Sequence, residues 1–254
     1  MIYVFDIDGT ICFNGKFIES RLRDAIHQLA QRHTVIFASA RPIRDLIPVV
    51  KDYQDHCLIG GNGSIVSQNG EIKVMDYIPN QLFEKIIKLI SIFDLDFIID
   101  SDFDYVAKVK QSNKIFQQLD PDNLASNIGI HKVKQPIKII LVDIKERIFD
   151  EVRDALQKFR QHLSINVHED DNNIDITAKE INKYTTLKKM IGEQNYIAFG
   201  NDINDAQLLK YAQKSIFVTA ETSKPEHYDT VIKNNADSVA EIIERLSSEL
   251  NSNK

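Results

Sequence analysis

Short apolar runs alternate with amphipathic segments in the first and last thirds of the chain. Runs rich in β-branched and aromatic residues predict buried strands, and they lie at 2–5, 34–38, 57–60, 196–199 and 215–218. Apolar residues at helical spacing predict helices, and these lie at 17–33, 43–53, 183–193, 203–211 and 238–250. A hairpin that turns at Asn69-Gly70 is predicted within residues 64–77. Strands that alternate with helices indicate an α/β fold with a parallel sheet.

The order of elements changes between residues 80 and 177. Two helices, an extended acidic and aromatic segment, an apolar strand and a strand pair are predicted there, at 82–93, 145–162, 96–109, 136–144 and 164–177. This order is typical of a small α+β unit. We therefore expect a core domain formed by residues 1–79 and 178–254, with residues 80–177 inserted as a second domain.

Composition narrows the class of protein. Of the 254 residues, 43% are hydrophobic and 27% are charged, as in ordinary globular proteins. The net charge of -6 argues against a nucleic-acid binder, which usually carries a basic stripe. No run approaches the roughly 20 apolar residues of a membrane span, and Met1 leads directly into the first strand. Cys12 and Cys57 fit no metal-ligand spacing. We expect a cytoplasmic protein without a nucleic-acid or membrane partner, and the oligomeric state stays open.

Two carboxylates follow the first predicted strand. Asp6 and Asp8 stand at the edge of a parallel sheet where α/β proteins bind ligands. On a continuing strand their side chains would share a face, and Gly9 would let the backbone come close to a ligand. A divalent cation would relieve their repulsion, and Mg²⁺ favours carboxylate and phosphate oxygens. The alternative is a strand end followed by a common Asp-Gly turn.

Three more polar clusters stand after a strand or at the start of a helix. Ser39 follows the second strand, where its hydroxyl could bind phosphate or cap a helix. Arg41 and Lys183 could each bind an anion, although both also suit a solvated surface. Residues 200–205 gather carbonyl and carboxylate oxygens suited to a hard cation, more than a helix N-cap needs.

Taken in order, the four clusters resemble the motifs of the haloacid dehalogenase superfamily. The matching segments are DIDGT at 6–10, ASARP at 38–42, the lysine in INKYTTL at 181–187, and FGNDINDAQLL at 199–209. The region between the second and third motifs resembles the type IIB cap of the Cof-type subfamily. This resemblance implies a Rossmann-like core, an α+β cap over the strand ends, and a phosphotransferase that uses Mg²⁺.

The resemblance also implies a role for each matching residue. Asp6 would be the nucleophile that becomes an aspartyl phosphate, and Asp8 would protonate the leaving oxygen and then activate water. The residues implied near the substrate are Arg41, Asn62 and Gly63. The groups implied to hold the phosphoryl group are Ser39, Lys183, Asn204 and the N–H groups of Ile7 and Ala40. The implied metal ligands are Asp6, the carbonyl of Asp8, Asn201, Asp202 and Asp205.

Two positions depart from the common family pattern. Ser39-Ala40-Arg41 stands where Thr-Gly-Arg is more frequent, a change that keeps the hydroxyl. Asn201 stands where an aspartate is more frequent, and asparagine offers an oxygen ligand without a charge. Cation affinity could fall as a result, unless Asp202 supplies the charge.

These features predict a Mg²⁺-dependent phosphatase that acts on small phosphorylated metabolites, with sugar phosphates favoured. A sugar phosphomutase is the alternative within the family, since it would pass the aspartyl phosphate to a second sugar hydroxyl. A non-catalytic sugar-phosphate-binding protein is the alternative outside enzymology, and the presence of both Asp6 and Asp8 argues against it. The side chains of the inserted unit that could contact the leaving group are Asp100, Asp102, Tyr105, Lys108 and His168.

Overall fold

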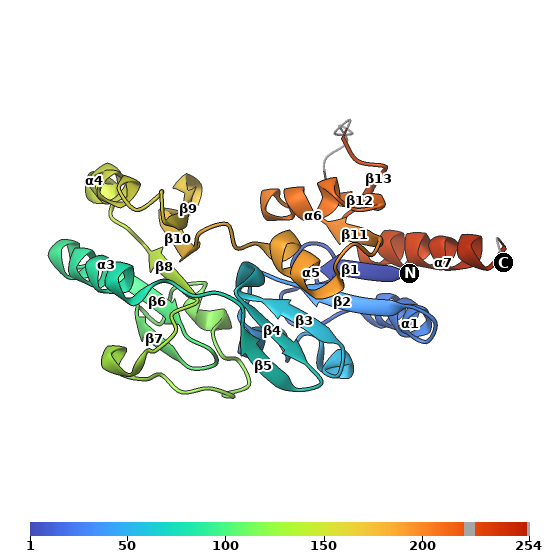
Figure 1. Ribbon diagram of the computed structural model, residues 1–254, viewed down its shortest axis with the longest axis horizontal. Helices are drawn as coiled ribbons and strands as arrows, with labels where there is room; N and C mark the ends of the chain where they lie inside the picture. The colour runs from blue at the N-terminus through green and yellow to red at the C-terminus, as the bar shows by residue number, and fades with distance from the viewer. Residues whose placement is uncertain (221–226, 253–254) are drawn as a thin grey trace.

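The computed structural model describes residues 1–220 and 227–252, and it contains two β-sheets in neighbouring lobes (Figure 1). The two ends of the chain build an eight-stranded sheet, and the middle of the chain builds a five-stranded sheet. The chain crosses between the lobes twice, so the segment that forms the second sheet is inserted in the sequence between two parts of the first lobe. Within the described ranges, no helix has the length and apolar character needed to cross a membrane.

The larger sheet is mostly parallel, with strand order β13-β12-β11-β1-β2-β3-β4-β5. Only the hairpin at the β5 edge adds antiparallel pairs. The bounds are β1 (Ile2–Asp6), β2 (Thr34–Ala38), β3 (Cys57–Gly60), β4 (Ile65–Gln68), β5 (Glu71–Val74), β11 (Tyr196–Gly200), β12 (Lys214–Thr219) and β13 (Thr230–Lys233). β1 lies between β2 and β11, and the strand order reverses there. The carboxyl end of β1 therefore lies at the point where open α/β sheets bind ligands.

Helices cover both faces of this sheet, which explains why its central strands β1, β2, β3 and β11 are buried apolar runs without polar alternation. Along β1, Tyr3 and Phe5 pack toward the helices of one layer, while Ile2 and Val4 pack toward the helices of the other. The first layer contains α1 (Ser20–Ala30), α2 (Ile43–Leu46) and α7 (Ala236–Ser252), and the second contains α5 (Lys183–Ile191) and α6 (Ala206–Lys210).

The five-stranded sheet is antiparallel, with strand order β7-β6-β8-β10-β9. Its strands are β6 (Asp96–Asp100), β7 (Tyr105–Lys108), β8 (Lys138–Val142), β9 (Leu163–His168) and β10 (Asn173–Ala178). One face packs against α3 (Asn80–Phe93) and α4 (Glu146–Gln157) in a separate apolar core. The other face borders the larger lobe, because Ile98 and Ile140 line a cavity together with Asp8 and Ala40.

The structure confirms the predicted α/β fold class, corrects two predicted elements and adds one strand that was not predicted. The helix predicted at 43–53 is wrong: α2 ends at Leu46, and a 3₁₀ turn follows at Lys51–Tyr53. Pro48 explains the break, because it has no N–H to donate and its ring clashes with the preceding turn. The segment predicted as extended over 96–109 is a hairpin of two strands, β6 and β7. The edge strand β13 was not predicted.

Candidate active site

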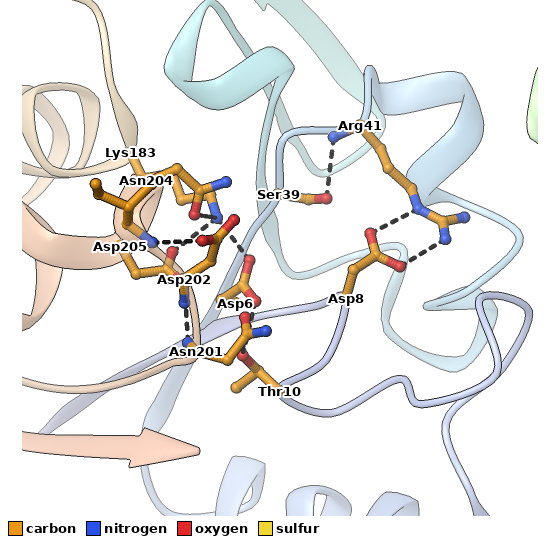
Figure 2. Close-up of polar contacts among 11 residues, drawn as sticks. Asp6, Asp8, Thr10, Ser39, Arg41, Lys183, Asn201, Asp202, Asn204 and Asp205 are labelled. Atoms are coloured by element: carbon orange, nitrogen blue, oxygen red, sulfur yellow. Dashed lines mark hydrogen bonds and ion pairs between the residues drawn. The ribbon is translucent and has the colours of Figure 1, made fainter. Parts of the chain in front are cut away.

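The carboxylate of Asp6 lies buried at the carboxyl end of β1, in the middle of the polar cluster (Figure 2). Lys183 Nζ donates a hydrogen bond to Asp6 Oδ1 at 2.6 Å, and Thr10 Oγ1 donates to Asp6 Oδ2 at 2.7 Å. Burial raises the pKa of Asp6 to about 7, although the Lys183 ammonium opposes the rise. Both carboxylate oxygens are thus held in place at the edge where open α/β sheets bind ligands.

Lys183 is the first residue of α5, and the helix N-terminus fixes its position. Thr185 N–H donates to Asn182 Oδ1 at 2.9 Å, and Asn182 N–H donates to Thr185 Oγ1 at 3.0 Å, which forms a capping box. The ammonium also contacts Asp205 Oδ1 at 2.7 Å. Burial opposes the charge of Lys183, but the carboxylates of Asp6 and Asp205 outweigh burial and raise its pKa. Two buried carboxylates therefore share one ammonium.

Asp8 points away from Asp6 and toward Arg41 (Figure 2). β1 ends at Asp6, and the chain turns at once because three following N–H groups donate to the carbonyl of Ile7. Arg41 Nε donates to Asp8 Oδ2 at 2.8 Å and Arg41 Nη2 donates to Asp8 Oδ1 at 2.6 Å, a bidentate ion pair. The strand does not continue, so Asp6 and Asp8 do not share a face, and Asp8 lies at the mouth of the site.

The segments after β2 and β3 pack together beside Asp6. Ser39 is buried, and its Oγ accepts a hydrogen bond from the N–H of Arg41 at 3.1 Å. Asn62 N–H donates to the carbonyl of Ser39 at 3.0 Å. Gly63 has φ +108°, and a Cβ there would lie 2.4 Å from the carbonyl oxygen of Asn182. Gly63 thus lets this loop pack against the start of α5, while Asn62 lines the cavity beside the site.

The side-chain amide of Asn201 faces three oxygen atoms. One amide atom lies 3.0 Å from each of Asp6 Oδ2, Thr10 Oγ1 and the carbonyl oxygen of Asp8. Thr10 has a single hydroxyl proton, which the shorter bond to Asp6 uses. With the amide nitrogen pointing inward, its two protons would be shared among the three oxygens. With the amide oxygen pointing inward, the site would suit a cation among them. Gly9 provides room, because a Cβ there would lie 2.3 Å from Asn201 Nδ2.

These atoms fit a magnesium ion as a set of mixed oxygen donors. Across the described ranges, no three His, Cys, Asp or Glu side chains form a metal cluster. The available donors are instead the Asp6 carboxylate, the Asp8 carbonyl and the Asn201 amide oxygen. Octahedral Mg²⁺ with ligands at 2.0–2.1 Å has neighbouring ligands about 2.9 Å apart, close to the 3.0 Å contacts that Asn201 makes.

The remaining residues of the last motif shape its loop. Asp205 is buried, and its Oδ2 accepts hydrogen bonds from the N–H groups of Asn201 at 3.0 Å and Asp202 at 3.3 Å. The exposed Asp202 accepts from the N–H of Ile203 at 2.6 Å. The carboxylates of Asp202 and Asp205 are therefore engaged within the loop. Asn204 Oδ1 accepts from Lys183 Nζ at 3.3 Å and borders the neighbouring cavity.

Two cavities separate this cluster from the five-stranded sheet. The smaller has a volume of about 290 Å³ and is bordered by Asp8 and Arg41, and the larger has a volume of about 730 Å³ and is bordered by Asn62 and Asn204. The residues that line both are Ala40, Lys138, His168 and Asp175.

Only part of the predicted substrate contacts line these cavities. Of the five residues of the inserted unit named from the sequence, Asp100 and His168 line a cavity, and Asp102, Tyr105 and Lys108 do not. Thr10, Lys138 and Asp175 were not predicted as site residues from the sequence. For Thr10 a signal existed, since its hydroxyl follows Asp6 by four residues in the same turn.

Comparison with known proteins identifies the fold. A family model described as haloacid dehalogenase-like hydrolase matches residues 3–243. A search of curated proteins finds no significant match. Among solved structures, TM0651 from Thermotoga maritima is 22% identical with a TM-score of 0.81, and 96% of each chain is covered.

Two further solved structures share this fold. A haloacid dehalogenase-like hydrolase from Bacteroides thetaiotaomicron is 19% identical, with a TM-score of 0.81 over 96% of this chain and 98% of that one. The protein described as the HAD subclass IIB sugar phosphatase BT4131 is 19% identical, with a TM-score of 0.74 over 97% of this chain and 98% of that one. At these identities the similarity establishes a shared architecture, including the second sheet.

Proposed function

Because the chain belongs to the haloacid dehalogenase-like hydrolase family, we propose that it is a Mg²⁺-dependent phosphatase of small phosphorylated metabolites, with sugar phosphates favoured. The observation that carries this proposal is the buried Asp6 carboxylate, which Lys183 and Thr10 orient. Lys183 also donates to Asn204, which borders the larger cavity. The shared fold with a protein described as a sugar phosphatase supports the substrate class.

In the first step, Asp6 would attack phosphorus as a carboxylate nucleophile and form an aspartyl phosphate. The Lys183 ammonium lies 2.6 Å from Asp6, so it would neutralise charge on the phosphoryl oxygens as they approach. The groups proposed to bind the phosphoryl oxygens together with Lys183 are Ser39, Asn204 and the backbone N–H groups of Ile7 and Ala40.

Asp8 would move protons in both steps. It would protonate the leaving oxygen as the first bond breaks, and it would then take a proton from the water that attacks the aspartyl phosphate. Its carboxylate is bound bidentately by Arg41, so either transfer requires Asp8 to turn from Arg41 toward the reacting atoms. Arg41 is therefore proposed as a positioning residue.

A magnesium ion would be held by the Asp6 carboxylate, the Asp8 carbonyl and the Asn201 amide oxygen. When bound, it would reduce the electrostatic repulsion of the Asp6 carboxylate and the phosphoryl oxygens. Asp205 would act indirectly, since it holds the backbone of Asn201. We also propose that residues 80–177 form a cap domain over a core of residues 1–79 and 178–254, and that the cap excludes water and contacts the leaving group.

The test is hydrolysis of an aryl phosphate by the purified protein with Mg²⁺. Activity should disappear with EDTA, return with added Mg²⁺, and be absent in Asp6→Asn. Asp55→Asn is the matched control, because Asp55 is an exposed carboxylate of the same lobe. Full activity in Asp6→Asn would contradict the proposal.

A sugar phosphomutase would give a different product balance. A phosphatase releases one inorganic phosphate for each ester consumed, turnover after turnover. A mutase keeps the phosphate esterified and moves it to another hydroxyl. Measuring inorganic phosphate against remaining sugar phosphate therefore separates the two reactions.

A further inference from the structure

The face of the five-stranded sheet that borders the cavities carries a polar row of side chains next to a row that contains two isoleucines and one aspartate. Asp100, Lys138 and Thr177 lie side by side across β6, β8 and β10. The neighbouring row consists of Ile98, Ile140 and Asp175. Residues paired in this register point to the same face, and the opposite face is covered by α3 and α4.

Lys138 presents a protonated ammonium to both cavities. Its side chain is only 9% exposed, and Asp175 Oδ2 lies 2.8 Å from its Nζ. Burial opposes the charge, but Asp175 outweighs burial and raises the pKa of Lys138. An ammonium has three donors, so Lys138 can serve a ligand while it stays paired with Asp175.

Two buried polar atoms of residues that line the larger cavity with Lys138 lack partners among the described residues. They are Thr177 Oγ1, on a side chain that is almost completely buried, and Asn62 Oδ1, from the opposite lobe. Both residues line the larger cavity. Buried hydroxyl and amide groups are almost always hydrogen-bonded in proteins. Their position therefore indicates a ligand with hydroxyl groups in this part of the cavity.

The charges around the smaller cavity decide what kind of ligand fits. Arg41 is paired with Asp8, and Lys138 is paired with Asp175, while the half-exposed His168 also lies near Asp175. The further carboxylates at this cavity are Asp171 and the pair Asp45 and Asp100, which share the buried Arg44. A second anionic group in this smaller cavity would still meet more carboxylates than cations, whereas the larger cavity is lined by Arg160 and Lys179 together with Glu180 and Asp202. Neutral hydroxyl groups can donate to carboxylates and accept from Lys138, and a sugar ring can lay its C–H face on Ile98 and Ile140.

We infer that Lys138, Thr177 and Asp175 form a leaving-group subsite for an uncharged polyhydroxyl group. This inference rests on the proposed phosphatase function. The substrates are then monophosphates of neutral sugars or polyols, and phosphorylated sugar acids and bisphosphates are selected against. The other residues of β8 are apolar and buried, so the sequence of this strand gives no sign that Lys138 lines a cavity.

The experiment compares kcat/KM for glucose 6-phosphate, 6-phosphogluconate and an aryl phosphate. The first two share a six-carbon skeleton, but only the second carries a carboxylate. We expect at least about tenfold preference for glucose 6-phosphate, because like charges placed together in a binding site cost affinity. Asp175→Asn should narrow this preference, since it removes one of the repelling carboxylates.

Two variants test the hydroxyl contacts through the ratio of glucose 6-phosphate to aryl phosphate turnover. Lys138→Met should lower this ratio about tenfold, because it removes a hydrogen bond from a charged donor. Thr177→Val should lower it about fivefold, because it removes a neutral hydrogen bond. Thr177→Val replaces an unpartnered hydroxyl by a methyl group, so its unfolding midpoint should not fall. Lys88→Met is the control, because Lys88 is exposed on α3 on the other side of the sheet.

The outcomes separate the two proposals. Two results would overturn the subsite but not the phosphatase function, provided that the aryl phosphate is hydrolysed. The first is an equal kcat/KM for the two sugar esters. The second is a ratio of glucose 6-phosphate to aryl phosphate kcat/KM that stays unchanged in Lys138→Met and Thr177→Val. Hydrolysis of none of the three esters by folded wild-type protein with Mg²⁺ overturns the proposed function, and the subsite with it.

Discussion

At the residue scale, the proposed active site contains a buried ion cluster. Lys183 Nζ lies within 2.7 Å of both Asp6 and Asp205, and the three side chains come from β1, the start of α5 and the loop after β11. Removing one partner from a buried ion pair leaves an uncompensated charge, which costs far more than a surface pair. The proposed catalytic cluster thus also contributes to stability, because it links three elements of the larger lobe.

Lys183→Met should lower the free energy of unfolding at pH 8 by about 3–5 kcal/mol. The loss should shrink as pH falls, because burial raises the pKa of Asp6 and the Asp6 carboxyl freed from Lys183 can take up a proton in the folded variant. Urea unfolding at pH 8 and pH 5 measures both effects. Lys189→Met, an exposed position on the same helix, is the control. Equal stability of Lys183→Met and Lys189→Met at pH 8 would contradict the cluster's role.

At the scale of elements, the approach of the loop 61–63 to α5 depends on Gly63. Gly63 and Gly70 both have positive φ, but only at Gly63 would a Cβ meet another atom, the carbonyl oxygen of Asn182. Gly63→Ala should therefore be less stable than Gly70→Ala, which carries backbone strain of about 1–3 kcal/mol but no clash. Thermal unfolding of the two variants gives this comparison. Equal melting temperatures would show that the loop adapts without cost.

Local patterns predicted most elements, and the errors have local physical causes. Buried runs such as 34–38 and 196–199 identified β2 and β11, because strands covered on both faces are apolar throughout. Pro48 was the signal against one helix over 43–53. β13 is a short edge strand whose residues are at most partly buried, so its pattern is weak.

At the scale of the whole molecule, a buried arginine links the two lobes. Arg44 on α2 forms an ion pair with Asp100 of β6 and donates to the carbonyl of Phe103 at 3.1 Å. Beside it, the N–H of Asp120 donates to Asp45 Oδ1 at 2.8 Å. Burial raises the pKa of Asp45 to about 6, although Arg44 opposes the rise. The contact between the lobes thus contains a carboxyl that is costly to ionise.

Asp45→Asn should change how stability depends on pH. Because the pKa of Asp45 is higher in the folded protein than its ordinary 3.8, its ionisation lowers the free energy of unfolding as pH rises from about 4 to about 6. Asparagine keeps an acceptor for Asp120 and cannot ionise. The variant should gain stability relative to wild type across that interval, by up to about 3 kcal/mol. A difference in the free energy of unfolding between Asp45→Asn and wild type that stays constant from pH 4 to pH 8 would contradict this account.

The distant parts of the site could not be predicted from local patterns. Asp6, Lys183 and Asn201 stand in recognisable motifs, so the sequence identified them. Lys138 stands in a strand between apolar residues, and only the packing of the two sheets brings it to the cavities. The pairing of Asp8 with Arg41 depends equally on tertiary structure, because the turn after β1 sets the direction of Asp8.

The central claim, that Asp6 is the nucleophile, is tested most directly by trapping its phosphorylated form. Wild-type protein with Mg²⁺ would be mixed with an aryl phosphate, quenched in acid within the first turnover, and mapped by peptide mass spectrometry. The account predicts one added phosphoryl group, on Asp6, and none in Asp6→Asn. A phosphoryl group on another residue, or turnover by Asp6→Asn without any phosphorylated peptide, would contradict it.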